Sequence, residues 1–119
     1  MSFPTSRPVA LVLEDDPVLS SIAFEILQGL GYVVYLASDV AEVTVLLERS
    51  AVAVLLTDVF MPGNVNGLHF ARSVAEQRPE TRIIIVSGRP GFSLALLPRD
   101  ATFLPKPYTE AQIREVLAS

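Results

Sequence analysis

The chain has 119 residues, half of them hydrophobic, which is enough for one domain with a buried core and too little for two ordinary domains. It has no cysteine, which excludes disulfide bonds and thiolate metal sites and suits a reducing compartment. The net charge of −4 argues against direct binding to nucleic acid, because an acidic surface is repelled by the phosphate backbone.

The sequence contains no pattern that predicts export or membrane insertion. The first residues lack the basic segment and long apolar stretch of a signal peptide. The longest apolar runs, such as residues 51–56, are far shorter than the ~20 residues that cross a bilayer as a helix. We therefore expect a cytoplasmic protein without membrane contact. It should form a single domain over residues 1–119, with its core at about residues 9–118.

The first half of the chain predicts two strands, each followed by a helix. The continuous apolar run Val9–Leu13 is typical of a parallel strand buried on both faces. Asp16 and Pro17 fit the N-cap and first position of a helix, and Ser38 is a candidate N-cap for a second helix. The strand between these helices is predicted at residues 32–37. Hydrophobic residues recur at helical spacing in the first helix (Val18, Ile22, Ile26, Leu27, Leu30) and in the second (Val40, Val43, Leu46, Leu47).

The second half continues the same alternation. Strands are predicted at residues 51–56, 82–86 and 102–104, and a helix at residues 68–77. The last helix begins at Thr109, with Gln112 three residues later in the pattern of a capping box. Two prolines and two glycines lie within residues 88–98, so a helix between the last two strands is expected to be shortened or absent.

This alternation predicts an α/β fold, with a doubly wound five-stranded parallel sheet, helices on both faces and right-handed crossovers. In such a sheet the ligand site lies beyond the carboxyl ends of the strands. The polar residues with chemical potential all follow predicted strand ends, and they are Glu14, Asp15, Asp58, Ser87 and Lys106.

These side chains have complementary chemistry. Carboxylates that lie close together repel one another unless a cation lies between them, and Mg²⁺ is the hard, oxygen-bound ion that suits phosphoryl chemistry. Asp58 is a candidate carboxylate nucleophile that would become an aspartyl phosphate. Lys106 would neutralise the phosphoryl oxygens and Ser87 would donate a hydrogen bond to one of them.

The set of motifs resembles the receiver domain of bacterial two-component response regulators. The likeness covers residues 9–118 and rests on four motifs at strand ends, namely Glu14-Asp15-Asp16, Asp58 with Met61-Pro62 and Gly67, Ser87-Gly88, and Lys106-Pro107. The resemblance implies a flavodoxin-like strand order 2-1-3-4-5. It also implies a phosphorylation switch in a phosphorelay, in which Asp58 accepts a phosphoryl group from a histidine kinase or histidine phosphotransfer protein. Such a domain is not an enzyme beyond its own phosphorylation and dephosphorylation, and it signals by contact with a downstream protein that the sequence does not name.

The resemblance also implies individual roles. Asp15, Asp58 and the backbone carbonyl of Phe60 would bind Mg²⁺, and Glu14 would act through a water molecule. Ser87 and Phe103 would be the switch residues that respond to the phosphoryl group, although Phe103 lies in a predicted strand and a core role fits it equally well. The Lys106-Pro107 bond is usually cis in the family.

Several residues have plainer interpretations. Asp16 is first of all a helix cap, His69 is expected to be a surface or packing residue, and Arg89 is expected to be a surface residue. The loop after Asp58 is one residue longer than the common form, which alters only its tip. One hypothesis is that residues 88–100 become ordered on phosphorylation.

Two alternative functions stay open. One is a degenerate receiver that binds partners without phosphorylation, and the irregular segment 88–101 keeps this interpretation open. The other is an aspartyl-nucleophile phosphatase. Haloacid-dehalogenase-like enzymes need an acid two residues after the nucleophile, and Phe60 at that position counts against this class.

Overall fold

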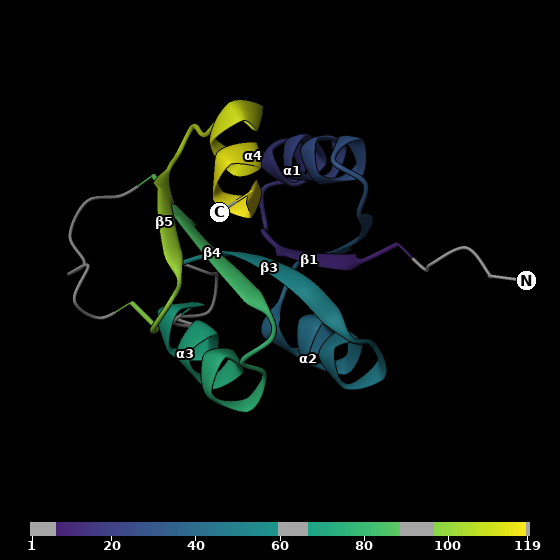
Figure 1. Ribbon diagram of the computed structural model, residues 1–119, viewed down its shortest axis with the longest axis vertical. Coiled ribbons are helices and arrows are strands. Elements are labelled where there is room, and N and C mark those ends of the chain that lie inside the picture. The colour runs from purple at the N-terminus through teal and green to yellow at the C-terminus, as the bar shows by residue number, and fades with distance from the viewer. Residues whose placement is uncertain (1–6, 60–66, 89–96, 119) are drawn as a thin grey trace, which may run out of the picture.

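The computed structural model describes residues 7–59, 67–88 and 97–118, and within them lie five strands and four helices (Figure 1). In chain order the elements are β1 (Val9–Leu13), α1 (Pro17–Gly29), β2 (Val33–Ala37), α2 (Val40–Arg49), β3 (Val52–Asp58), α3 (Gly67–Gln77), β4 (Arg82–Ser87), β5 (Thr102–Pro105) and α4 (Glu110–Ala118).

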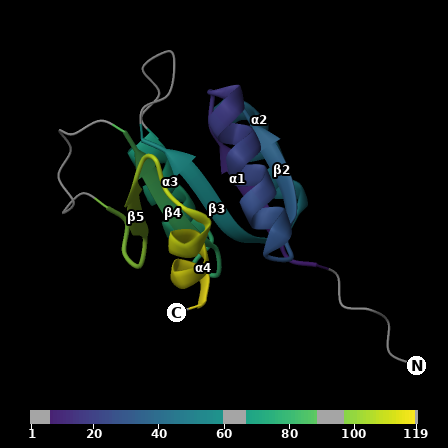
Figure 2. The ribbon, with the colours of Figure 1, turned by 90° about the horizontal axis from the view of Figure 1, so that it is seen from above.

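The strands form one parallel sheet in the order β2-β1-β3-β4-β5, which confirms the predicted doubly wound architecture. Helices α1 and α4 cover one face of the sheet, and α2 and α3 cover the other (Figures 1 and 2). Every strand therefore ends at the same edge of the sheet, which we call the carboxyl edge.

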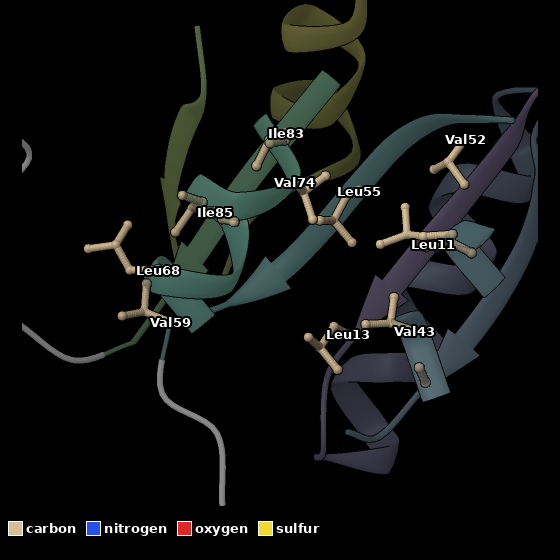
Figure 3. Close-up of a cluster of buried hydrophobic side chains, with 13 residues drawn as sticks. Leu11, Leu13, Val43, Val52, Leu55, Val59, Leu68, Val74, Ile83 and Ile85 are labelled. Carbon is tan, nitrogen blue, oxygen red and sulfur yellow. The ribbon is translucent and has the colours of Figure 1, made fainter. Parts of the chain in front are cut away.

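Alternating side chains of the strands enter two separate hydrophobic clusters. Leu11 and Leu13 of β1 point into the cluster under α2 and α3, called the α2/α3 cluster (Figure 3). Ala10 and Val12 point the other way, into the α1/α4 cluster. Successive residues of a strand face opposite sides, and both sides are covered here, so β1 is apolar throughout.

Two helical details differ from the expectations. In α1 the buried residues are Ser20, Ala23 and Leu27, whereas Val18 and Ile22 are 66% and 43% exposed. Leu27 is buried as predicted, and Ile26 and Leu30 pack partly buried against the α1/α4 cluster, whereas the other two buried positions are the small residues Ser20 and Ala23. In α2 the expected cap at Ser38 is wrong, because Asp39 is the N-cap and its Oδ1 accepts a hydrogen bond from the Glu42 N–H at 2.8 Å.

Strands β3, β4 and β5 extend slightly beyond their predicted ends, to Asp58, Ser87 and Pro105. Strand β3 continues through Asp58, which pairs with Val86, and β4 continues to Ser87, which pairs with Pro105 of β5. The capping box of α4 is confirmed, because the Thr109 N–H donates to Gln112 Oε1 at 2.8 Å and the Gln112 N–H donates to Thr109 Oγ1 at 3.1 Å.

The expected short helix between β4 and β5 falls largely on residues 89–96, outside the described part of the chain. Among the described residues, none of the helices is both long and apolar enough to cross a bilayer.

Candidate functional site

The carboxyl edge brings the five predicted site residues to one end of the sheet. Backbone hydrogen bonds continue the ladder just past the strand ends and fix where these residues leave it. The Glu14 N–H donates to the Ala37 carbonyl at 3.1 Å, and the Lys106 N–H donates to the Ser87 carbonyl at 2.9 Å. Residues that are far apart in sequence therefore start from fixed backbone positions at the same edge.

Three carboxylates form the centre of the site. One oxygen from each of Glu14, Asp15 and Asp58 lies within 4.8 Å of the other two. Glu14 and Asp58 are buried, at 4% and 7% exposure, whereas Asp15 is exposed to solvent. Buried negative charges at this distance repel one another, and an all-oxygen set of donors is the type that holds a hard divalent cation. The donor chemistry of this cluster therefore fits a bound cation of that class.

Lys106 links two of these carboxylates. Its Nζ lies 2.5 Å from Glu14 Oε1 and 2.6 Å from Asp58 Oδ2. Burial by itself would lower the Lys106 pKa, but the hydrogen bonds and negative charges of Asp58 and Glu14 outweigh that effect and raise the pKa above its ordinary 10.5. The ammonium group is thus held in its charged form against the carboxylate of Asp58.

Glu14 has a different balance. Burial raises its pKa, and the negative charge of Asp58 adds to this, while the hydrogen bonds from Lys106 and from the Asp16 N–H act in the opposite direction without cancelling the rise. The bond from Asp16 measures 3.1 Å to Glu14 Oε2. Glu14 is therefore fixed at both oxygens, by a lysine and by a backbone N–H.

Asp16 acts as the helix cap that the sequence predicted. Its Oδ1 accepts hydrogen bonds from the N–H groups of Val18 at 2.9 Å and Leu19 at 3.2 Å, at the start of α1. Asp16 Oδ1 thus caps α1, whereas the preceding residues Glu14 and Asp15 belong to the carboxylate cluster. His69 on α3 is exposed, as expected.

Ser87 and Phe103 lie on the same face of the sheet. Ser87 is buried at the end of β4, two residues after Ile85, and Phe103 of β5 pairs directly with Ile85. Ile85 belongs to the α2/α3 cluster, and the half-buried Phe103 packs against that cluster. This arrangement places both predicted switch residues toward α3, and their switching role stays a prediction.

Several predictions fall outside the described residues. These are the metal-binding backbone carbonyl of Phe60, the Met61-Pro62 motif and the surface position of Arg89. The Lys106-Pro107 peptide bond is cis, as the resemblance implied.

Three residues around the site were not recognised as functional from the sequence. Tyr108 packs against the α1/α4 cluster beside the site, and burial, reinforced by the charge of Glu14, raises its pKa to about 12. Thr57 is fully buried, and its Oγ1 donates to the Asp58 carbonyl at 3.1 Å. Gly67 was noted only as part of a motif, although a side chain at this position would collide with the Asp58 carbonyl. For Tyr108 and Thr57 the available signal was their closeness in sequence to Lys106 and Asp58, and for Gly67 it was its place in the motif that follows Asp58.

A separate cavity of about 790 Å³ lies at the opposite end of the sheet. It is lined among others by Arg82 and Thr102, the first residues of β4 and β5. Since Ser87 lies at the other end of β4, this cavity is remote from the carboxylates and takes no part in their chemistry.

Comparisons with known proteins agree with this geometry. The family model described as the response regulator receiver domain matches residues 10–118. The response regulator receiver protein CpdR of Brucella abortus (strain 2308) is 31% identical over 101 residues, which cover 82% of this chain and 83% of that protein.

Solved structures show the same fold. A response regulator receiver protein from Sinorhizobium medicae WSM419 matches with a TM-score of 0.86 and 24% identity, covering 97% of this chain and 94% of that chain. A response regulator protein from Burkholderia pseudomallei, solved with a phosphorylated aspartic acid, calcium ion and citrate, matches with a TM-score of 0.79 and 24% identity, covering 92% of this chain and 66% of that chain. The family match, the relative and the architecture agree, and the chain belongs to the response regulator receiver domain family.

Proposed function

We propose that this protein is a phosphorylation switch in which Asp58 accepts a phosphoryl group from a phosphohistidine. The observation that carries the proposal is the contact of Lys106 Nζ with Asp58 Oδ2 at 2.6 Å, inside a cluster of three carboxylates. A lysine and a cation site converging on one carboxylate supply the charge that phosphoryl transfer needs around its nucleophile.

The proposed reaction is a displacement at phosphorus. A carboxylate oxygen of Asp58 attacks, a P–O bond forms and the P–N bond of the donor breaks. The electron pair of the broken bond stays on the imidazole nitrogen, and the donor ring leaves neutral because its other nitrogen carries a proton. Lys106 then pairs with a phosphoryl oxygen, and Ser87 donates a hydrogen bond to another. Attack of water on the acyl phosphate would later release inorganic phosphate and restore Asp58.

The cation in this proposal is Mg²⁺, held by Asp15 and Asp58, by the backbone carbonyl of Phe60 and through water by Glu14. When bound, Mg²⁺ supplies positive charge that offsets the negative charge of the phosphoryl oxygens. The oxygen-only donor set supports a hard ion, and the calcium ion of the Burkholderia pseudomallei structure belongs to the same chemical class.

The proposed output is protein contact. Receiver domains are signalling modules rather than metabolic enzymes, and the family relationship implies partners of the two-component type. We propose a histidine kinase or histidine phosphotransfer protein as donor and a downstream protein as target, with Ser87 and Phe103 linking the phosphoryl group to the surface. The family match over residues 10–118 supports one receiver domain, and a cytoplasmic location remains a prediction.

The direct test is the mass of the intact protein after incubation with Mg²⁺ and acetyl phosphate. We expect wild type to gain one phosphoryl group, only when Mg²⁺ is present, and Asp58→Asn to gain none. If wild type gains no phosphoryl group although calorimetry shows bound Mg²⁺, the switch is wrong and a phosphorylation-independent binding module is favoured. A gain that persists in Asp58→Asn would place the acceptor elsewhere.

A further inference from the structure

The main-chain carbonyl of Asp58 is held by a neighbour on its N-terminal side. Thr57 is fully buried, and its Oγ1 donates a hydrogen bond to the Asp58 carbonyl oxygen at 3.1 Å. The other end of the same peptide group is held as well, because the Val59 N–H donates to the Val86 carbonyl at 3.1 Å. Both polar groups of the peptide that follows the acceptor are therefore held by hydrogen bonds.

Gly67, the first residue of α3, has no room for a side chain beside the same carbonyl. A Cβ added to Gly67 would lie 2.0 Å from the Asp58 carbonyl oxygen and 3.1 Å from both the Asp58 carbonyl carbon and the Val59 oxygen. The Gly67 N–H also donates to the Val59 carbonyl at 2.9 Å. Because the obstructing atoms are backbone, they cannot rotate away as the end of a flexible side chain would.

We propose that Thr57 and Gly67 are positioning residues for phosphorylation, and that together they form a carbonyl clamp on Asp58. The proposal rests on the proposed function and adds residues to it that do not touch the phosphoryl group. The Asp58 side chain and its carbonyl share one Cα, so a displaced peptide carries the carboxylate away from Lys106 Nζ and from the other two carboxylates. Phosphoryl transfer depends on alignment, and a misplacement of about 1 Å can cost ~100-fold in rate.

The chain offers a matched control for Gly67. Gly29, the last residue of α1, has open space around an added Cβ, with nothing within 4 Å. Gly29→Ala and Gly67→Ala are therefore the same chemical change in an open and in a blocked position. For Thr57, Val removes the hydroxyl at nearly constant shape, and Ser keeps the hydroxyl while removing the methyl group.

The experiment measures the phosphorylation rate against acetyl phosphate concentration, the Mg²⁺ dissociation constant by calorimetry, and thermal unfolding, for all four variants. We expect Gly67→Ala to lower the maximal rate by about 10- to 100-fold at a temperature where the variant is folded. Thr57→Val should lower it by about fivefold, with the rate restored in Thr57→Ser. Both impaired variants should also bind Mg²⁺ more weakly, whereas Gly29→Ala should match wild type.

A maximal rate and Mg²⁺ affinity in Gly67→Ala equal to those of Gly29→Ala would overturn the clamp. If Gly67→Ala does not fold, the Thr57 pair decides, and equal rates and Mg²⁺ affinities for Thr57→Val and Thr57→Ser would overturn it. If wild type itself is not phosphorylated, the proposed function fails, and the Mg²⁺ affinities of the same variants still test whether the clamp positions the Asp58 carboxylate.

Discussion

Lys106 is the residue on which the charge balance of the site depends. It joins carboxylates that leave two different strands, Glu14 after β1 and Asp58 at the end of β3. Both carboxylates are buried, so the ammonium group offsets charges that water reaches poorly. Removing one partner of such a group leaves uncompensated charge behind, which costs more than the pair itself contributes.

Lys106→Met should therefore destabilise the fold by about 2–4 kcal/mol at neutral pH, because Glu14 and Asp58 lose their cation. Urea unfolding measures the change. Arg114→Met is the control, since Arg114 and Glu110 form an ion pair at 3.3 Å that is more than half exposed. The control should change stability by less than about 0.5 kcal/mol. Equal losses in the two variants would contradict the bridging role of Lys106.

Tyr108 makes the folded state sensitive to alkali. Its pKa rises from 10.0 to about 12, since burial and the charge of Glu14 disfavour the phenolate. Below pH 10 the phenol is protonated in both states and its contribution is complete. Above that, the unfolded chain loses the proton first, so the contribution is lost as the pH rises toward about 12.

The expected loss from Tyr108 at about pH 11 is on the order of 1 kcal/mol relative to neutral pH, less where solvent screens the partly exposed phenol. Tyr108→Phe should lack this part of the alkaline decline, and urea unfolding at several pH values compares the two proteins. The difference between their near-ultraviolet titration curves should give the ionisation of Tyr108 alone. Identical alkaline declines in wild type and Tyr108→Phe would show that the phenol is not protected.

At the scale of single elements, the start of α2 shows which of two adjacent residues, Ser38 or Asp39, caps the helix. Asp39 accepts a hydrogen bond from the Glu42 N–H, whereas Ser38 Oγ donates to the Glu42 side chain at 2.8 Å on the exposed surface. Asp39→Ala should cost about 1 kcal/mol, because an N–H at the helix start loses its partner. Ser38→Ala should cost less than about 0.5 kcal/mol. Chemical denaturation measures both, and the reverse order would restore Ser38 as the cap.

Element positions were predictable where local pattern and burial agree. The run Val9–Leu13 matches β1 at both ends, because a strand covered on both faces is apolar throughout. The buried face of α1 was predictable only in its second half, at Leu27, because the burial of the first half depends on how closely the helix approaches the sheet. Small residues such as Ala23 face inward there, while Val18 is exposed.

The site was predictable to the level of residues but not of contacts. Parallel strands gather their ends at one edge, so Glu14, Asp58 and Lys106 could be grouped from the order of elements alone. That Lys106 contacts both carboxylates depends on side-chain positions set by the whole sheet. The contact of Gly67 with Asp58 depends on the path of the backbone into α3, which no local pattern specifies.

At the scale of the whole molecule, the sheet separates two cores and carries the carboxylates at one end. The α2/α3 cluster and the α1/α4 cluster both include side chains from β1, β3 and β4. An interaction that stabilises the ends of these strands therefore stabilises both cores. Asp15 follows β1 and Asp58 ends β3, and these two strands are neighbours in the sheet. A cation bound between them would therefore link strands that support the entire fold.

Mg²⁺ should accordingly stabilise the whole domain against unfolding, because the unfolded chain does not hold Glu14, Asp15 and Asp58 together. Binding to the folded state alone raises the free energy of unfolding by about 2.7 kcal/mol when the ion is at 100 times its dissociation constant. Thermal unfolding with and without Mg²⁺ measures this, and a chelator should reverse it.

Asp15→Asn should lose most of the gain, since a neutral amide attracts the ion less than a carboxylate does. Sodium chloride at equal ionic strength controls for screening of the net charge. An equal rise with sodium chloride, or an undiminished rise in Asp15→Asn, would show that the cluster does not bind the cation.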